Sequence, residues 1–515
     1  MFSAHAGLSA ALASFIWLHA ALPSAAAGDD IPAPPEFADV RAFVEDAIQR
    51  RLAPSVAVGV VRDGELVWAE GLGAADLKTQ RPATSRSIYR LASISKPITA
   101  TGLMILVEQG RIDLDAPANR YLPHDKLRCY AGAADEMTIR RLANHTAGMP
   151  LHYSFYYEGT PPPAMDETIR CYGFAAARPG SRWEYSNLAF GVLNYITEVA
   201  SGTAWREFME SQVYDPLKMT HTSDRIRPGC ESDAVVQYNR LPIGGFAAVG
   251  HYDFDHPGAS AVCSSVQDLA RFARMHLNGG TLDGVRILSP EAVRRMQEVT
   301  GHYGNDGEGC GVSWFVSTVR GQRCIAHGGG MPGVSTSLQI FPDANAAIIV
   351  LTNGTERSLT SGVSRRLAAV LFPDEPPIAA PRPAVFSDSD SAGTPPASES
   401  TEAEPDGATL SGTWRGRIVH PDGDLDATLD LQTGDEASFT LGGQPEHSLS
   451  DLTVGRDRVN GRVTVDLRTR SDDEQPVLLE LRLELEDDRL AGVAIAHGGG
   501  RFALSHHIEL RRVPD

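Results

Sequence analysis

Apolar positions over residues 37–68 follow first a helical period and then two short, continuous runs. Over residues 37–52 they fall on one face of a helix, which predicts an amphipathic helix. Two apolar runs follow, at 56–61 and 66–68, separated by Asp63-Gly64. This dipeptide is typical of a tight hairpin turn, because the turn requires positive φ angles. The segment therefore predicts a helix followed by a β-hairpin.

Strand patterns return after a long, mainly helical stretch. A helix is expected over 98–109, and strands are expected within 314–352, including the apolar run 346–351. A last helix is expected over 358–371. Strands at both ends of a helical middle indicate an α/β (α+β) domain over residues 28–372. Its single sheet would be assembled from both ends of the domain, with a helical insert between them.

The composition changes abruptly at Pro373. Residues 373–408 are rich in proline and acidic side chains and cannot bury a core, which predicts a disordered linker. Beyond it, residues 409–515 alternate apolar and polar positions, most clearly over 479–485. This period of two predicts a small all-β barrel or sandwich. Its opening residues, 412–414, resemble the first strand of lipocalin-like barrels. We expect the whole β domain to pack against the other domain or to restrict substrate access.

Residues 1–27 have the pattern of an export signal. An apolar run over 8–21 is too short to span a bilayer and is followed by Ala25-Ala26-Ala27. The segment contains no Lys or Arg, although export signals usually begin with a positive charge. The alternative is a buried N-terminal helix, which the polar break at 28–30 disfavours. We expect a periplasmic or extracellular protein, and no later stretch is expected to be a transmembrane helix.

Charge and cysteine content narrow the possible functions. The 515-residue chain carries a formal net charge of −19 without a basic block, so nucleic-acid binding is not expected. Its six cysteines lack metal-type C-x-x-C spacing. Cys310 and Cys324 flank an expected strand pair and are the preferred disulfide, while buried thiols are an equal alternative for the other four.

Ser93-Ile94-Ser95-Lys96 is the first candidate for chemistry. Residues three apart share a helix face, so Ser93 and Lys96 can touch. A serine hydroxyl needs a base, and a lysine becomes one when burial lowers its pKa to about 7–8. The chain has only four lysines, and apolar residues follow this one, which argues against a surface pair. The motif predicts Ser93 as a nucleophile and Lys96 as its proton acceptor.

Two further motifs carry suitable side chains. Tyr185-Ser186-Asn187 precedes an apolar helical stretch, and a phenol and an amide there could relay protons and orient the lysine. A second Tyr-x-Asn begins at Tyr303, but it lies in a glycine-rich stretch typical of turns. Residues 327–330, His-Gly-Gly-Gly, offer backbone N–H groups that could face an oxyanion.

The hexapeptide 325–330 recurs unchanged at 495–500. The second copy lies between what look like short alternating runs and is interpreted as a glycine turn. The first copy is expected to lead into a long strand of the domain that carries Ser93.

In order, Ser93-x-x-Lys96, Tyr185-x-Asn187 and His327-x-Gly329 resemble the three motifs of the serine β-lactamase-related family. The resemblance covers residues 38–372. It implies a β-lactamase/transpeptidase-like fold, with an antiparallel sheet flanked by helices and a helical subdomain. It also implies catalysis by Ser93, Lys96 and Tyr185, substrate binding by Asn187, His327 and Gly329, and an oxyanion hole formed by the N–H groups of Ser93 and Gly330.

One departure from the family pattern bears on the substrate. β-Lactamases and carboxypeptidases usually have a lysine where this chain has His327, and that lysine attracts a carboxylate. We therefore expect acyl-enzyme hydrolysis of small esters or of peptides and amides that contain D-amino acids. A β-lactamase or penicillin-binding carboxypeptidase is the alternative, and a slow sensor of cell-wall fragments is the second. No cofactor or metal is expected, because the cluster at 251–256 is interpreted as a surface loop.

Overall fold

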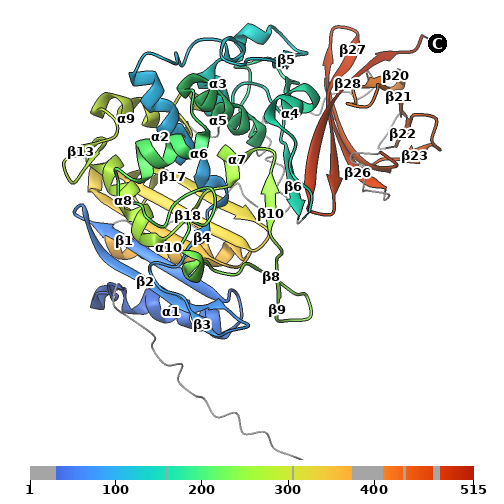
Figure 1. Cartoon of the computed structure of the whole chain (residues 1–515). Coiled ribbons are helices and arrows are strands. Elements are labelled where there is room, and N and C mark those ends of the chain that lie inside the picture. The colour runs from blue at the N-terminus through green and yellow to red at the C-terminus, as the bar shows by residue number, and fades with distance from the viewer. Residues whose placement is uncertain are drawn as a thin grey trace, which may run out of the picture.

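The structure is a computed structural model that describes residues 30–157, 159–303, 307–373, 410–432, 436–467 and 476–514. The expected signal at 1–27 and the expected linker, apart from Pro373, lie outside these ranges. The described residues form an α/β unit and an all-β unit that pack side by side (Figure 1). No helix within the described ranges is long and apolar enough to cross a membrane.

Nine described strands form the sheet of the α/β unit, and every pairing between neighbours is antiparallel. In spatial order they are β14 (Gly301–His302), β15 (Gly309–Cys310), β16 (Phe315–Val319), β17 (Gln322–Met331), β18 (Val334–Phe341), β19 (Ala346–Thr352), β1 (Ser55–Arg62), β2 (Glu65–Asp76) and β3 (Arg81–Pro82). The two ends of the unit meet where Val58 of β1 pairs with Val350 of β19. The predicted assembly of one sheet from both ends is confirmed.

Helices cover both faces of this sheet (Figure 1). On one face, α1 (Ala38–Gln49) and α10 (Arg357–Leu371) enclose a core that includes Trp68 and Phe341. On the other, α8 (Val266–Leu277) packs on β1 and β19. All seven residues of β19 are buried, as expected for a strand with a core on each side. The predicted hairpin is also present, with φ of 52° at Asp63 and 77° at Gly64.

The remaining helices form the predicted insert. The insert is built around α2 (Ser95–Glu108), whose residues from Ser95 to Leu106 are all buried. This burial on every side explains why most of the segment is apolar, with Lys96 as its one buried charged-type side chain. The other helices are α3 (Ile139–Ala143), α4 (Met165–Tyr172), α5 (Asn187–Ser201), α6 (Trp205–Met209), α7 (Pro257–Ser260) and α9 (Pro290–Gln297). Short strands connect them: β4 (Tyr89–Arg90), β5 (Arg128–Cys129), β7 (Phe174–Ala175), β8 (Tyr238–Arg240), β9 (Phe246–Ala248), β10 (Tyr252–Phe254), β11 (Cys263–Ser264), β12 (Thr281–Leu282) and β13 (Val285–Arg286).

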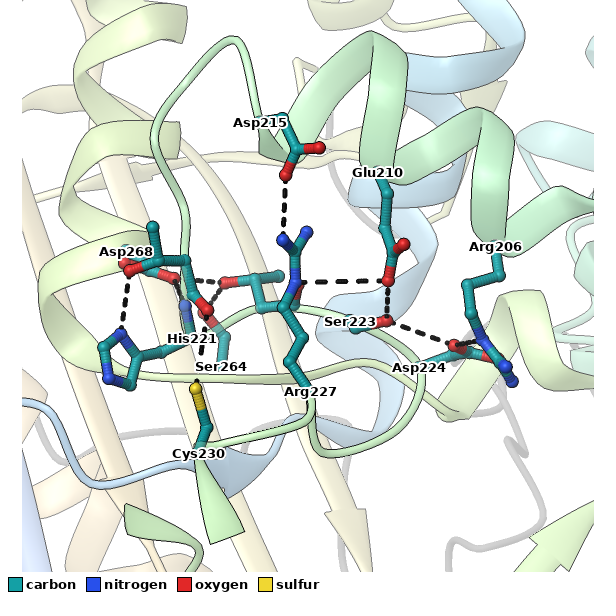
Figure 2. A network of polar contacts seen from close by, with 12 residues as sticks. Arg206, Glu210, Asp215, His221, Ser223, Asp224, Arg227, Cys230, Ser264 and Asp268 are labelled. Carbon is teal, nitrogen blue, oxygen red and sulfur yellow. Dashed lines mark hydrogen bonds and ion pairs between the residues drawn. The ribbon is translucent and has the colours of Figure 1, made fainter. Parts of the chain in front are cut away.

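A network of polar contacts fixes the chain around the first turn of α8 (Figure 2). The Asp268 carboxylate accepts hydrogen bonds from the Thr222 hydroxyl at 2.8 Å and from the His221 backbone N–H at 2.7 Å. The Thr222 hydroxyl also lies 2.7 Å from that of Ser264 in β11. Since Ser264 pairs with Tyr89 of β4, the network holds the strand that leads into residues 91–96.

The C-terminal unit is an up-and-down sheet that is nearly closed into a barrel. Its order is β24-β25-β26-β27-β28-β20-β21-β22-β23, so all neighbours in the sheet are also neighbours in sequence except the pair β28 and β20, and β23 and β24 stand at the two ends. The predicted barrel is confirmed, and its interior is filled by buried side chains such as Trp414 and Phe439. The strands are β20 (Gly412–Ile418), β21 (Leu425–Leu431), β22 (Ala437–Leu441), β23 (His447–Ser448), β24 (Ser450–Val454), β25 (Arg458–Val465), β26 (Val477–Glu486), β27 (Arg489–Gly498) and β28 (Phe502–Arg512).

The barrel docks on the α/β unit through the outer face of β27 and β28. Strand β6 (Tyr153–Tyr157) of the α/β unit pairs with the start of β28, where Phe502 lies opposite Ser154. Val493, Ile495 and Ala503 of the barrel bury against residues that include Leu151 and Phe174. The two units therefore share an apolar interface and a strand pairing, which places the barrel beside the insert (Figure 1).

Two sequence expectations need correction. The second hexapeptide does contain a turn, with φ of 52° at Gly499 and 78° at Gly500, but the strands around it, β27 and β28, are 10 and 11 residues long rather than short. The preferred disulfide is wrong, because Cys310 and Cys324 are free thiols. They lie on β15 and β17 with β16 between them, and two strand spacings of about 4.8 Å exceed the Cα separation that a disulfide spans.

Candidate active site

Ser93 and Lys96 lie at the start of α2, as the spacing predicted. Ser93 is in a short 3₁₀ turn (Ala92–Ile94) that runs into the helix, and its side chain is partly exposed. The Lys96 amine is fully buried, and its Nζ atom lies 3.0 Å from Ser93 Oγ. Ala92 adopts a φ of 49°, an unusual value for a residue with a side chain, directly before Ser93. The exposed hydroxyl is thus held against a buried amine.

The surroundings of Lys96 favour its uncharged form. Burial lowers the pKa of Lys96 well below its ordinary value of 10.5, and desolvation is the cause of this shift. Besides Ser93, the amine contacts Asn187 Oδ1 at 2.8 Å and the carbonyl oxygen of Ala259 at 3.2 Å. An uncharged amine has two N–H donors and one lone pair. The two carbonyl-type oxygens accept its N–H groups, and the lone pair is left for the hydroxyl proton of Ser93.

Asn187 is the first residue of α5, and its amide is oriented by a second contact. Its Nδ2 donates to the carbonyl oxygen of His152 at 3.0 Å, which turns Oδ1 toward Lys96. The helix is capped by the hydroxyl of Ser186, which accepts from the N–H of Ala189 at 3.4 Å. The amide of the Tyr-x-Asn motif therefore contacts Lys96, because Asn187 lies at the start of a capped helix.

Tyr185 completes the group around the serine. Its phenol hydrogen-bonds to Ser93, and its ring centroid lies 4.7 Å from Lys96 Nζ. Desolvation raises the pKa of Tyr185 above its usual value despite the hydrogen bond to Ser93, so the phenol keeps its proton. The ring of His145 packs against it at 4.4 Å, and His145 Nδ1 accepts from the N–H of Ser186 at 3.2 Å. Tyr185 is thus held beside Ser93 with its phenol protonated.

Strand β17 forms the opposite wall of the site. Its residue Gly329 faces the turn that carries Ser93, where an added Cβ would overlap the carbonyl oxygen of Leu91 and the hydroxyl of Thr336. That hydroxyl donates to the same carbonyl at 2.8 Å. Only glycine allows the strand to lie this close to the serine turn, and the next residue, Gly330, then lies beside the site.

We expect Gly329→Ala to destabilise the protein by about 1–3 kcal/mol, because backbone rather than a flexible side chain must move to admit the methyl group. Gly328→Ala is the matched control, since its Cβ would meet only the Thr336 carbonyl oxygen at an ordinary 3.5 Å. Denaturant unfolding of both variants measures the difference. Equal losses in the two variants would contradict the close approach of Gly329.

His327 is buried, with 1% of its surface exposed, and packs on Phe315 with ring centroids 4.8 Å apart. Desolvation lowers its pKa to about 3, with a smaller contribution from Lys96, so the ring is neutral. Its Nδ1 lies 2.7 Å from the Gly328 carbonyl oxygen, which places the proton on Nδ1. Nε2 is buried and has no hydrogen-bond partner among the described residues. His327 therefore brings no positive charge to the site.

The rival Tyr-x-Asn motif is only partly described. Tyr303 packs on Trp183 at 5.1 Å and on Phe315 at 5.7 Å, while residues 304–306 lie outside the described ranges. Trp183 and Phe315 also lie near Tyr185, at 6.1 and 6.5 Å between ring centroids. Tyr303 thus contributes to an aromatic wall beside the site, and Tyr185 is the tyrosine that reaches Ser93.

The expected surface loop at 251–256 is wrong for its last two residues. Asp255 and His256 are buried, whereas His251 is exposed and Asp253 is partly exposed. Asp255 joins His152 at 2.8 Å and His256 at 2.5 Å, each through a different carboxylate oxygen. Burial alone would raise the pKa of Asp255, but the two histidines hold it below its usual value. The cluster's ligand atoms lie close enough for a metal ion, but both oxygens already bond the imidazoles.

This cluster lies directly behind Asn187, since the carbonyl of His152 accepts the Asn187 amide. Sequence reasoning also missed the Ala259 carbonyl on Lys96 and the guanidinium of Arg357, which lies against Gly330. No motif marks these three contacts. Ala259 lies in α7, the cluster follows β10 and Arg357 begins α10, so only the tertiary fold brings these residues around the site.

The family model described as Beta-lactamase matches residues 40–371. The chain is 26% identical over 351 residues to Unguisins hydrolase ungD' of Aspergillus campestris, covering 65% of this chain and 64% of that protein. It is 26% identical over 323 residues to Penicillin-binding protein 4* of Bacillus subtilis, covering 57% and 66%. The chain spans slightly less than two thirds of the length of these relatives.

Two solved structures share the fold over almost the whole chain. The octameric penicillin-binding protein homologue from Pyrococcus abyssi superposes with a TM-score of 0.56 at 20% identity, covering 91% of this chain and 99% of that one. The crystal structure of SurE gives a TM-score of 0.61 at 23% identity, covering 93% and 99%. At this identity the likeness concerns the fold alone, and its coverage extends beyond the family match into the C-terminal barrel.

Proposed function

Because the chain belongs to the β-lactamase family, whose members are typically serine hydrolases, we propose that it hydrolyses esters or D-amino-acid-containing peptides and amides through an acyl-enzyme at Ser93. The observation that carries this proposal is the set of contacts around Lys96. A fully buried amine lies 3.0 Å from a partly exposed hydroxyl, and its other two partners are oxygens that can only accept. This is the arrangement that a base needs in order to activate a serine.

In the first step, Lys96 takes the Ser93 proton as Oγ attacks the substrate carbonyl. The backbone N–H groups of Ser93 and Gly330 stabilise the oxyanion of the tetrahedral intermediate. Tyr185, which keeps its proton and hydrogen-bonds to Ser93, donates that proton to the leaving group as the scissile bond breaks. Lys96 then returns a proton to the Tyr185 phenolate. In the second step water attacks the ester at Ser93 and Lys96 accepts its proton. Lys96 then returns that proton to Ser93 Oγ as the acyl–oxygen bond breaks and the acid product leaves.

The third motif supports the proposed substrate class. His327 is neutral and buried, so the position that carries a lysine in penicillin-hydrolysing relatives offers no charge to a carboxylate. The aromatic wall formed by Trp183, Phe315 and Tyr303 suits an apolar acyl or leaving group. Esters and peptide bonds need no charge at the His327 position. Turnover of β-lactams is the alternative, and a relative named as penicillin-binding makes it worth testing directly.

A panel of three substrates tests this proposal. The purified protein is assayed with p-nitrophenyl esters, D-alanine amides and a chromogenic cephalosporin, and the reaction is quenched for intact-protein mass spectrometry. We expect ester or amide turnover and an adduct on the peptide that contains Ser93. Faster turnover of the cephalosporin than of both other classes would move the function to β-lactams. Stoichiometric labelling without turnover would instead support the second alternative, a slow sensor of cell-wall fragments.

The role of Asn187 predicts a shift in the pH profile. A carboxylate beside Lys96 stabilises the charged amine, so Asn187→Asp should raise the pKa of Lys96. Activity is lost as the pH falls through the pKa of the base, and the acid limb of kcat/KM should therefore move to higher pH. Asn187→Ala removes the hydrogen bond without adding charge and is the control. Identical acid limbs in the aspartate variant and the wild type would contradict this role.

A further inference from the structure

The two acceptors of the Lys96 amine belong to segments that are far apart in the sequence. Asn187 begins α5, and its amide is held by the carbonyl oxygen of His152, the residue before β6. Ala259 lies in α7, a helix of four residues that follows His256 directly. A helix of one turn is not stable by itself, so its position depends on contacts with its surroundings. Both segments therefore need a contact that fixes them relative to each other.

Asp255 supplies this contact. It is 2% exposed, and its two carboxylate oxygens face different histidines, Oδ2 at 2.8 Å from His152 Nε2 and Oδ1 at 2.5 Å from His256 Nδ1. Burial raises the pKa of Asp255, but the histidines hold it below its usual value, so the carboxylate is ionised and accepts from both rings. Hydrogen bonds to an ionised group are about twice as strong as those between neutral groups. One carboxylate thus joins the residue that orients Asn187 to the residue that precedes α7.

The three side chains of this cluster act on the amine only through other groups. The hydrogen bonds of Lys96 go to Ser93, Asn187 and Ala259, and none goes to the cluster. Burial lowers the pKa of His256, although the carboxylate opposes this shift, so its ring is neutral. The ring nitrogen that faces Asp255 is therefore a fixed donor. The cluster has the properties of a rigid bridge rather than those of a proton relay to the substrate.

Other contacts hold the same two segments more coarsely. In α7, the carbonyl oxygen of Gly258 accepts from the Thr99 hydroxyl at 2.8 Å, and its N–H donates to Asn194 Oδ1 at 3.1 Å. On the other side, the carbonyl oxygen of Leu151 accepts from the hydroxyl of Ser505 in the barrel. These contacts do not depend on the cluster. Removal of the Asp255 carboxylate should therefore leave the fold in place and release only the alignment of the two segments.

We propose that Asp255 is a positioning residue of the reaction centre, which holds the two acceptors of the Lys96 amine in place through His152 and His256. This inference rests on the proposed hydrolase function. The lone pair of the amine is directed at Ser93 only while both N–H groups keep their acceptors. A displacement of about 1 Å in such a site can lower a rate by about 100-fold.

Kinetics of Asp255→Ala with p-nitrophenyl acetate test the proposal. We expect kcat to fall by about 10–100-fold, because the amine is misaligned. KM should change by less than about threefold, since the groups that contact the substrate remain. Melting curves of the same preparation give the folded fraction, by which kcat is corrected.

Asp166→Ala is the matched control. Its carboxylate accepts from the Tyr195 hydroxyl at 2.7 Å on α5, the helix that Asn187 begins. This contact lies about 12 Å along the helix from Asn187, since each residue advances the axis by about 1.5 Å. The control should lower the melting temperature and keep kcat within about threefold of the wild type.

Two substitutions of His256 separate positioning from stability. Both remove the ring and its packing on Phe254, whose centroid lies 5.5 Å away. His256→Asn keeps an N–H donor near the position of Nδ1, whereas His256→Ala removes it. We expect the asparagine variant to retain at least about tenfold more kcat than the alanine variant at a similar melting temperature. This pair decides the question if Asp255→Ala does not fold.

Three results would overturn the proposal: equal kcat in Asp255→Ala and Asp166→Ala, a loss in Asp255→Ala that lies in KM alone, or equal kcat in the two His256 variants. In each case, ester turnover by the wild type that depends on Ser93 would still support the hydrolase. Absence of such turnover in the wild type would instead overturn the proposed function itself.

Discussion

Replacing Ser93 with alanine is expected to lower kcat for ester or amide hydrolysis by at least about 10⁴-fold, because the covalent step is lost while substrate binding and the oxyanion donors remain. The fold should be unaffected, since Ser93 is partly exposed and removing its hydroxyl leaves no large cavity. Steady-state kinetics and mass spectrometry of the acyl-enzyme measure the effect. The variant should form no adduct.

Ser95→Ala is the control for this variant. Ser95 is fully buried two residues away, and its hydroxyl accepts from the N–H of Val262 at 3.0 Å rather than contacting Lys96. We expect it to destabilise the fold by about 1 kcal/mol and to keep turnover within about tenfold of the wild type. Turnover that survives in Ser93→Ala and disappears in Ser95→Ala would contradict the assignment of the nucleophile.

Lys96→Met should have opposite effects on activity and on stability. Removing the base is expected to lower kcat by about 10²–10⁴-fold. At the same time the protein should become more stable, because an apolar side chain of similar length replaces an amine in a fully buried position. Melting curves and kinetics on the same preparation measure both effects. Lys78→Met, at an exposed lysine, is the control and should change neither.

The gain in stability should depend on pH. The folded-state pKa of Lys96 lies below the unfolded value of about 10.4, so the unfolded wild type binds more protons and its stability rises with pH. The advantage of Lys96→Met is therefore largest at acidic and neutral pH and shrinks as the pH approaches 10.4. A variant that is less stable than the wild type across this range would contradict a buried, uncharged amine.

Much of the fold could be predicted because local patterns and the final structure agree. The Asp63-Gly64 turn, the buried run that became β19 and the alternation in β26 each specify their own conformation. The order of the three motifs indicated the family, and the structure brings Ser93, Lys96, Tyr185 and Asn187 together. These residues are near in space because two helices begin at the same place.

What sequence reasoning missed depends on tertiary packing. Asp255 and His256 look like loop residues, but the pairing of β10 with β6 places them behind Asn187, where they bury as a hydrogen-bonded group with His152. The two cysteines of the preferred disulfide are separated by a strand whose position the sequence does not reveal. Ser505 belongs to the barrel, and only the docking of the barrel brings its hydroxyl to the carbonyl oxygen of Leu151.

The central claim is that the Lys96 amine is uncharged at neutral pH. The chain has only four lysines, so protein labelled with ¹³C at lysine Cε should give four NMR signals that can be followed with pH. We predict that one signal titrates well below the ordinary lysine pKa of about 10.4 and is absent from Lys96→Met. The account is contradicted if all four signals, including the one that is absent from Lys96→Met, titrate near 10.4.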